Sequence, residues 1–288
     1  MVFKGVGTAL VTPFCVDGNV DYLALENLIE KQIENNIDAI IILGTTGESS
    51  TITNKERETI ITFSKRIINN RCKLIVGTGS NCTDTAIKLT KQAETLGADA
   101  CLIVSPYYNK CTQQGIIEHY KQINSKANIP FIVYNVPSRT GINILPETEL
   151  ELSKLNNMCG IKEANDNINH ILELFNKVNA PIYCGNDNLN YLFNCLGGVG
   201  TISVASNAYP KLIKKQFEAN SNLLQQHLLL HNFFELLFAE PNPIPIKFVL
   251  SYKGLIKNNL RLPLTPLSEN HILKLVQEIE KLENLWKF

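Results

Sequence analysis

A lysine at the end of a short apolar run is the residue of this sequence whose position most favours chemistry. Lys162 closes the run Cys159–Lys162 and is followed by Glu163 and Ala164. A partly buried lysine holds its proton less tightly, and its neutral amine is a nucleophile that forms a Schiff base with a carbonyl carbon. Alternatively, the side chain only extends its aliphatic stem and leaves the ammonium group in solvent. Position alone leaves both interpretations open.

Two other segments place polar side chains directly after apolar runs. Residues 44–49 read Gly-Thr-Thr-Gly-Glu-Ser, in which the glycines permit a tight turn and the hydroxyls and backbone N–H groups suit a carboxylate. The alternative for this segment is a capped start of the next helix. In the second segment, Tyr134 ends the run Phe131–Tyr134 and Arg139 lies in the loop beyond it.

Short apolar runs alternate with longer segments of helical period, which is typical of β-α units around a parallel sheet. Eight runs have strand length: Gly5–Val11, Ala39–Leu43, Lys73–Gly77, Ala100–Ser105, Phe131–Tyr134, Cys159–Lys162, Ile182–Cys184 and Gly200–Val204. Helices are predicted over Asp21–Asn36, Thr53–Asn70, Thr83–Leu96 and Gln113–Lys126. The first three open on an Asp or Thr suited to capping.

Eight such units predict an α/β fold, a (β/α)8 TIM barrel with a C-terminal helical extension, because an open doubly wound sheet typically uses fewer strands. In a barrel, reactive groups lie at the carboxyl ends of the strands, where Lys162 and Tyr134 fall. Strand-like runs stop after about Pro210. We therefore predict a catalytic barrel over residues 1–224 and a helical extension over residues 225–288.

Helical periodicity accounts for most of the C-terminal part. Helices are predicted over Leu212–Phe238, Ile244–Lys257 and Asn270–Trp286. The five histidines, which fall on helix-like stretches, are expected to be packed or at the surface: His119, His170, His227, His231 and His271.

Composition excludes several classes of function. Lys plus Arg and Asp plus Glu number 27 each, and no basic run is present, so nucleic acid is not expected as a partner. No apolar stretch approaches the length of a membrane span, and none resembles a signal peptide. The eight cysteines are scattered without metal-ligand spacing, which favours a reducing cytoplasm and no metal site.

A set of motifs runs through the whole chain in order. They are Gly44–Glu48, Gly77–Asn81, Pro106–Lys110, Tyr134–Gly141, Gly160–Ala164 and Glu240–Lys247. With these motifs the chain resembles the 4-hydroxy-tetrahydrodipicolinate synthase (dihydrodipicolinate synthase) family of pyruvate-dependent aldolases, whose superfamily includes N-acetylneuraminate lyase.

The resemblance implies an enzyme that condenses pyruvate with L-aspartate 4-semialdehyde in the diaminopimelate and lysine pathway. Lys162 would carry the pyruvyl imine, whose protonated form accepts electrons, so that the pyruvyl methyl group loses a proton and attacks the aldehyde as an enamine. The resemblance implies no external cofactor and no metal.

The resemblance also assigns a proton relay to Tyr134, Thr45 and Tyr108, with Tyr134 next to the imine. Tyr107 would reach a neighbouring subunit's site or line the interface beside Tyr108, in a homotetramer built as a dimer of dimers. Alternatively, the two adjacent tyrosines only pack as aromatic anchors at an interface.

Substrate contacts follow from the same resemblance. Thr46 would bind the pyruvyl carboxylate, and Arg139 would bind the carboxylate of the semialdehyde with its planar, two-pronged donor. Gly185 and Ile202 would supply backbone contacts and a wall, although both also fit ordinary strand-end and core positions.

A lysine-binding regulatory site is only partly preserved. Four residues match or nearly match it: Ser49, Ser50, Asn81 and Tyr107. The family's two histidines are replaced by Asn54 and Arg57, and its acidic residue falls on Thr85, next to Asp84. Since Arg57 adds a charge of the same sign as the ligand's ammonium groups, we expect weak or absent inhibition by lysine.

Three other functions compete with this one. A sibling aldolase for sugar acids is disfavoured by Arg139 and by the Thr45-Thr46 pair, and a non-catalytic sensor would be expected to lose Lys162 or a relay hydroxyl. A barrel enzyme for phosphate substrates needs a glycine-rich loop after strand seven or eight, whereas Gly197–Gly200 precedes the eighth strand.

Overall fold

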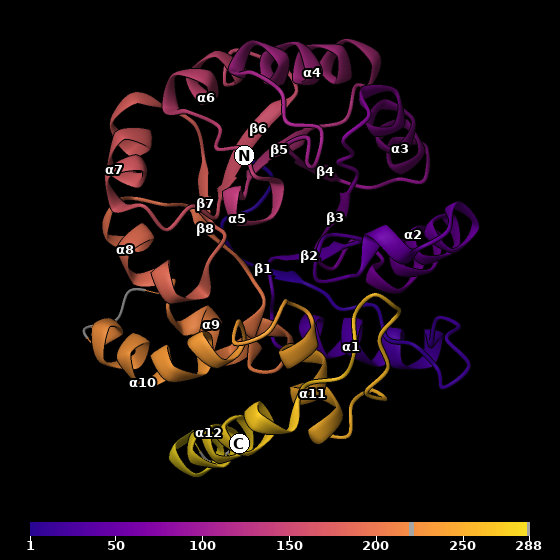
Figure 1. Cartoon of the computed structure of the whole chain (residues 1–288), viewed down its shortest axis with the longest axis vertical. Helices are drawn as coiled ribbons and strands as arrows, with labels where there is room; N and C mark the ends of the chain where they lie inside the picture. Colours follow the sequence, from indigo (N-terminus) through magenta and orange to yellow (C-terminus); the bar gives the residue numbers. More distant parts are fainter. Residues whose placement is uncertain (219–221, 287–288) are drawn as a thin grey trace.

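The structure is a computed structural model that describes residues 1–218 and 222–286 of the chain. Eight parallel strands close into a barrel in sequence order, with β1 paired to β8 (Figure 1). They are β1 Gly5–Ala9, β2 Ala39–Ile42, β3 Lys73–Gly77, β4 Ala100–Val104, β5 Phe131–Asn135, β6 Met158–Glu163, β7 Ile182–Cys184 and β8 Gly200–Ser203. The predicted (β/α)8 barrel is confirmed, and each strand starts or ends within two residues of its predicted bounds.

Helices surround the barrel as a ring (Figure 1). The helices up to β8 are α1 Tyr22–Glu34, α2 Asn54–Ile68, α3 Thr83–Thr95, α4 Gln113–Lys126, α5 Pro137–Thr140, α6 Pro146–Leu152, α7 Ile168–Lys177 and α8 Asn190–Cys195. Short 3₁₀ turns are η1 Ser49–Thr51, η2 Asp187–Leu189 and η3 Ala205–Asn207.

Two of the three predicted helix caps are present. Asp21 accepts a hydrogen bond from the Ala24 N–H, and Thr53 forms a capping box with Glu56. The predicted cap at Thr83 is wrong, because α3 has Cys82 at the capping position without a side-chain bond. The Thr83 hydroxyl instead lies 3.0 Å from Nδ1 of His119 on α4.

The C-terminal part consists of helices that lie outside or beneath the ring in Figure 1. They are α9 Pro210–Lys215, α10 Leu223–Leu236, α11 Ile244–Tyr252 and α12 Glu269–Trp286. A single helix over Leu212–Phe238 is therefore wrong, although residues 219–221 of that prediction lie outside the described residues. No helix of the described chain combines the length and apolarity needed to cross a membrane.

Strand side chains are buried on both faces of the barrel wall. One apolar cluster fills the barrel interior and includes Ile41, Ile75 and Ile132, and a larger cluster lies between the strands and the helices. Burial on both faces explains why these strands read as continuous apolar runs. The register of β5 and β6 pairs Tyr134 with Lys162 and, one residue on, Asn135 with Glu163.

Candidate active site

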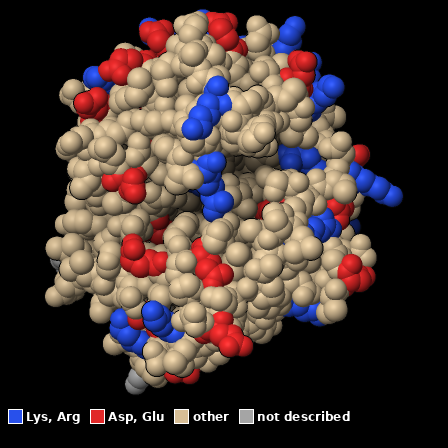
Figure 2. Space-filling model, viewed as in Figure 1, with Lys and Arg blue, Asp and Glu red and all other residues tan. Residues whose placement is uncertain are grey.

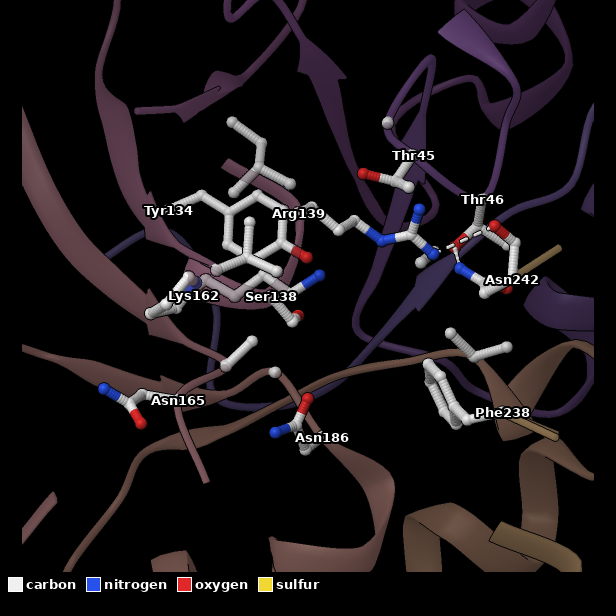
Figure 3. A pocket seen from close by; sticks show the side chains of 18 of the residues that line it. Thr45, Thr46, Tyr134, Ser138, Arg139, Lys162, Asn165, Asn186, Phe238 and Asn242 are labelled. Carbon is white, nitrogen blue, oxygen red and sulfur yellow. Dashed lines mark hydrogen bonds between the residues drawn. The ribbon is translucent and has the colours of Figure 1, made fainter. Parts of the chain in front are cut away.

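A pocket of about 390 Å³ opens at the carboxyl ends of the strands (Figure 3). It is lined from the ends of several strands, from the loop after β2 and from the segment that precedes α11. Six residues predicted for the site line it: Thr45, Thr46, Tyr134, Arg139, Lys162 and Gly185. The barrel thus brings together groups from positions more than a hundred residues apart in the chain.

Lys162 projects from β6 into this pocket and is 6% exposed. Its Nζ lies 4.1 Å from the centroid of the Tyr134 ring, which the β5–β6 register places beside it (Figure 3). Within the described chain, no carboxylate pairs with the Lys162 amine. The amine is therefore held against an aromatic face and is not tied up in an ion pair, which leaves it available to a carbonyl ligand.

The loop after β2 is anchored by a buried ion pair. Glu48 adopts a left-handed backbone conformation with φ of 54°, and its carboxylate binds Lys247 of α11. The same carboxylate accepts a hydrogen bond of 3.1 Å from the Arg261 backbone N–H. Burial lowers the pKa of Lys247 to about 8. Helix α2 is capped separately by Thr53, so the loop of residues 44–49 does not cap that helix.

Asn242 is a site residue whose role the sequence does not predict. Its Nδ2 donates a hydrogen bond of 2.9 Å to the Thr46 hydroxyl, and its backbone carbonyl accepts one of 3.0 Å from Arg139 Nη2 (Figure 3). Asn242 lies in the Glu240–Lys247 motif, but nothing in that motif's local pattern identifies its partners. The C-terminal segment therefore completes the pocket.

Three predicted residues lie away from this pocket. Ile202 is fully buried in the barrel core, and Tyr108 is 90% exposed with a φ of 71°. Tyr107 is 38% exposed and lines a neighbouring groove. Among the residues that the structure describes, no hydrogen bond joins Tyr134, Thr45 and Tyr108. A single chain therefore does not assemble the predicted relay.

The neighbouring groove contains most of the predicted regulatory residues. Ser49, Ser50, Thr85 and Tyr107 line it, whereas Asn81 and Asp84 do not. Arg57 also lines the groove, where its Nη2 donates to the Gly77 carbonyl and burial lowers the pKa of its guanidinium to about 10.

The face drawn in Figure 2 is hollowed near the centre of the ring of helices, and Lys and Arg side chains lie beside the hollow. Positive charge at such a place favours anionic ligands. None of the five histidines lines the pocket. One of them, His170, belongs to a buried cluster with Glu149 and Glu163 on the opposite side of β6.

Fold and pocket together define a (β/α)8 barrel protein with a lysine at the mouth of the barrel. The model of the dihydrodipicolinate synthetase family matches residues 2–282. A 4-hydroxy-tetrahydrodipicolinate synthase of Alkaliphilus oremlandii is 51% identical over 97% of this chain and 99% of its own. The chain belongs to this family, and the predicted family is confirmed.

Solved structures agree with this assignment. A dihydrodipicolinate synthase from Thermotoga maritima has a TM-score of 0.95 and 42% identity, covering 98% of this chain and 99% of its own. A chloride-inhibited dihydrodipicolinate synthase from Acinetobacter baumannii, complexed with pyruvate, has a TM-score of 0.94 and 38% identity, covering 97% and 98%.

Proposed function

We propose that this chain condenses pyruvate with L-aspartate 4-semialdehyde, the 4-hydroxy-tetrahydrodipicolinate synthase reaction of lysine and diaminopimelate biosynthesis. The observation that carries the proposal is the Lys162 amine, which lies in the pocket beside the Tyr134 ring without a carboxylate partner in the described chain. The relatives carry the name of this activity, and one of the similar structures is a complex with pyruvate.

The proposed chemistry begins at Lys162. Its neutral amine attacks the keto carbon of pyruvate, water leaves, and a protonated imine forms. The imine withdraws electrons from the neighbouring methyl group, which loses a proton and becomes the nucleophilic carbon of an enamine. This carbon then bonds to the aldehyde carbon of the semialdehyde. The reaction needs neither a metal nor an external cofactor.

Two groups in the pocket fit the carboxylates of the substrates. We assign the pyruvyl carboxylate to Thr46 with nearby backbone groups, and the semialdehyde carboxylate to Arg139, whose planar guanidinium can donate two parallel hydrogen bonds. Gly185 follows β7 at the pocket wall, where an added Cβ would lie 2.8 Å from both the Ala164 Cβ and the Glu163 carbonyl oxygen. Ile202 supports the site from the core.

The proton relay of Tyr134, Thr45 and Tyr108 is proposed for an oligomer. Tyr108 is too exposed in one chain to act inside the pocket, but an exposed aromatic pair at Tyr107 and Tyr108 suits an interface with a second copy. We propose a homotetramer in which this contact brings Tyr108 into the relay and Tyr107 to the neighbouring site.

We further propose that the protein acts in the cytoplasm, which suits its eight unpaired cysteines. The division into a barrel over 1–224 and an extension over 225–288 remains a prediction. Helix α10 begins at Leu223, close to the proposed boundary.

The proposed substrate is tested by steady-state assays in which a coupled reductase follows the product. We expect activity with both substrates, and Arg139→Lys should raise KM for the semialdehyde by about 10-fold or more, because lysine lacks the two-pronged donor. The control is imine formation with pyruvate alone, which this variant should retain. Activity with a sugar-acid aldehyde in place of the semialdehyde would contradict the proposal.

A further inference from the structure

A buried polar cluster lies on the opposite side of β6 from the pocket. It brings together Asn135 of β5, Glu163 of β6, Glu149 of α6 and His170 of α7, and all four side chains are buried. Strand side chains alternate between the two faces of a sheet, so Lys162 points into the pocket and Glu163 points toward the helices. The cluster therefore stands directly behind the residue that we propose forms the imine.

One backbone group sets the orientation of the amides in this cluster. The Ile144 N–H donates a hydrogen bond of 3.0 Å to Asn135 Oδ1. Asn135 Nδ2 must then be the group that faces Asn143 Oδ1 at 2.8 Å and the Glu163 carboxylate oxygens at 3.0 and 3.1 Å. Because the donor at Ile144 cannot be exchanged for an acceptor, the amide orientation of Asn135 is determined.

The same arrangement of hydrogen bonds determines the tautomer of His170. Asn143 Oδ1 also accepts from Asn165 Nδ2 at 3.0 Å, so Asn143 Nδ2 is the group that faces His170 Nδ1 at 3.3 Å. His170 Nδ1 therefore accepts, and the ring hydrogen is on Nε2. Nε2 lies 3.1 Å from Glu163 Oε2 and donates to it.

The two carboxyl groups of the cluster differ in their partners. Glu163 accepts hydrogen bonds from Asn135, from His170 and, at 2.7 Å, from the Asn165 backbone N–H. Neither oxygen of Glu149 has a hydrogen-bond partner in the described chain. Burial and the charge of Glu163 raise the pKa of Glu149 well above its usual range. The hydrogen bonds that Glu163 accepts, and the raised pKa of the unpartnered Glu149, favour Glu163 as the carboxylate and Glu149 as the protonated acid.

A metal ion is the competing occupant of this cluster. Ligand atoms of Glu149, Glu163 and His170 lie within 4.8 Å of one another. However, the His170 Nε2 that would bind the ion carries a hydrogen in the arrangement set by Ile144, and a metal ligand must be unprotonated. The hydrogen-bond order therefore disfavours a metal ion at these three residues.

We infer that Glu163 is a positioning residue that places a fixed negative charge behind β6 and stabilises the protonated imine on Lys162 across the barrel wall. This inference rests on the proposed function. The titratable groups that face Glu163 from the neighbouring elements are Glu149 on α6, His170 on α7 and Cys184 on β7, and burial raises the pKa of the Cys184 thiol well above its usual range. With these three groups neutral, Glu163 carries the charge of the cluster.

The step on which Glu163 would act creates a positive charge. The amine nitrogen of Lys162 bonds to the keto carbon of pyruvate, and the keto oxygen leaves as water with one proton from the amine and one from solvent. The nitrogen keeps its other hydrogen and carries the positive charge. A carboxylate in the low-dielectric barrel wall interacts with this charge far more strongly than a carboxylate in water.

The test is the pH profile of imine trapping by pyruvate and cyanoborohydride on the full chain, measured by mass spectrometry. With Glu163→Gln, we expect the rising limb and the falling limb of the plot of imine trapping against pH to move to lower pH. The expected shift is roughly half a unit to one unit. Glu149→Gln is the matched control, because it replaces the neutral acid with a neutral amide and keeps the anion, so its profile should coincide with that of the wild type. Coincident profiles for Glu163→Gln and the wild type would overturn the inference.

A second measurement needs no substitution at Glu163. In ¹⁵N-histidine spectra of the wild type, assigned with His170→Gln, the His170 ring should be neutral with its hydrogen on Nε2. A cationic ring, an Nδ1 hydrogen, or a stoichiometric metal that Glu149→Gln releases would overturn the inference. If the wild type forms no imine at Lys162, the proposed function fails as well, whereas an unshifted Glu163→Gln profile removes this inference alone.

Discussion

The side-chain amide of Asn242 donates a hydrogen bond of 2.9 Å to the hydroxyl of Thr46, across 196 residues of sequence. The backbone carbonyl of Asn242 also accepts from Arg139. The C-terminal segment therefore connects the two side chains that we propose bind the carboxylates of the two substrates. The positions of Thr46 and Arg139 therefore depend on Asn242, which lies outside the barrel strands.

Replacement of Asn242 should weaken substrate binding. We expect Asn242→Ala to raise the KM for pyruvate about 3- to 10-fold, because Thr46 loses one neutral hydrogen bond, whereas the backbone carbonyl that accepts from Arg139 remains. Asn242→Asp should cost more for the semialdehyde, since the new carboxylate pairs with Arg139 in place of the substrate. Asn35→Ala, which removes a hydrogen bond from a side-chain amide to the Lys31 carbonyl at the end of α1, is the control. Unchanged KM values in both Asn242 variants would show that the contact has no role in binding.

The buried ion pair between Lys247 of α11 and Glu48 of the loop after β2 should stabilise the folded protein. Lys247→Met leaves the Glu48 carboxylate buried without its partner, which is expected to lower the free energy of unfolding by about 3–5 kcal/mol. Urea unfolding measures this loss. Lys154→Met, which breaks an exposed pair with Glu151, should cost less than about 1 kcal/mol. Equal losses in the two variants would contradict the importance of the buried pair.

Glu149 should make stability depend on pH. Its pKa is raised in the folded protein, so between the unfolded and folded pKa values the native state binds more protons than the unfolded state. The stabilisation is complete below the unfolded pKa, near 4.3, and is lost as pH rises, at up to about 1.4 kcal/mol per pH unit. Thermal unfolding of the wild type and Glu149→Gln from acid to neutral pH measures the difference. Parallel curves would show that Glu149 is ionised in the native state.

Lysine should inhibit weakly or not at all. Among the described residues that line the groove with Ser49 and Tyr107, Glu48 supplies the carboxylate, but it is already paired with Lys247, and Arg57 adds positive charge. We expect no loss of activity up to about 1 mM lysine. Arg57→Gln should increase lysine sensitivity, whereas Lys55→Gln, at an exposed position of the same helix, should not. Inhibition of the wild type at micromolar lysine would contradict this prediction.

Strands and site residues were predictable from sequence to different degrees. Barrel strands are buried on both faces, so each appears as an apolar run whose ends lie within two residues of the strand, and for Lys73–Gly77 the ends coincide. Lys162, Tyr134 and Arg139 could be placed at one edge because parallel strands present their carboxyl ends together. Local pattern was sufficient for these features.

Other features depend on contacts between distant parts of the chain. The Thr83 hydroxyl does not cap α3 because His119, 36 residues away, lies within hydrogen-bond distance of it. The roles of Asn242 and Lys247 are set by partners near residues 46–48, and no periodicity shows such contacts. Tyr108 is 90% exposed and has a φ of 71°, and no local pattern in the sequence indicates either feature.

Covalent trapping of the imine tests the role of Lys162 most directly. The full chain is incubated with pyruvate, reduced with borohydride and mapped by peptide mass spectrometry, with Lys162→Arg as the control. We expect one reduced pyruvyl adduct, located on Lys162 and absent from the control. An adduct on another lysine, or no adduct at all, would contradict the central role of Lys162.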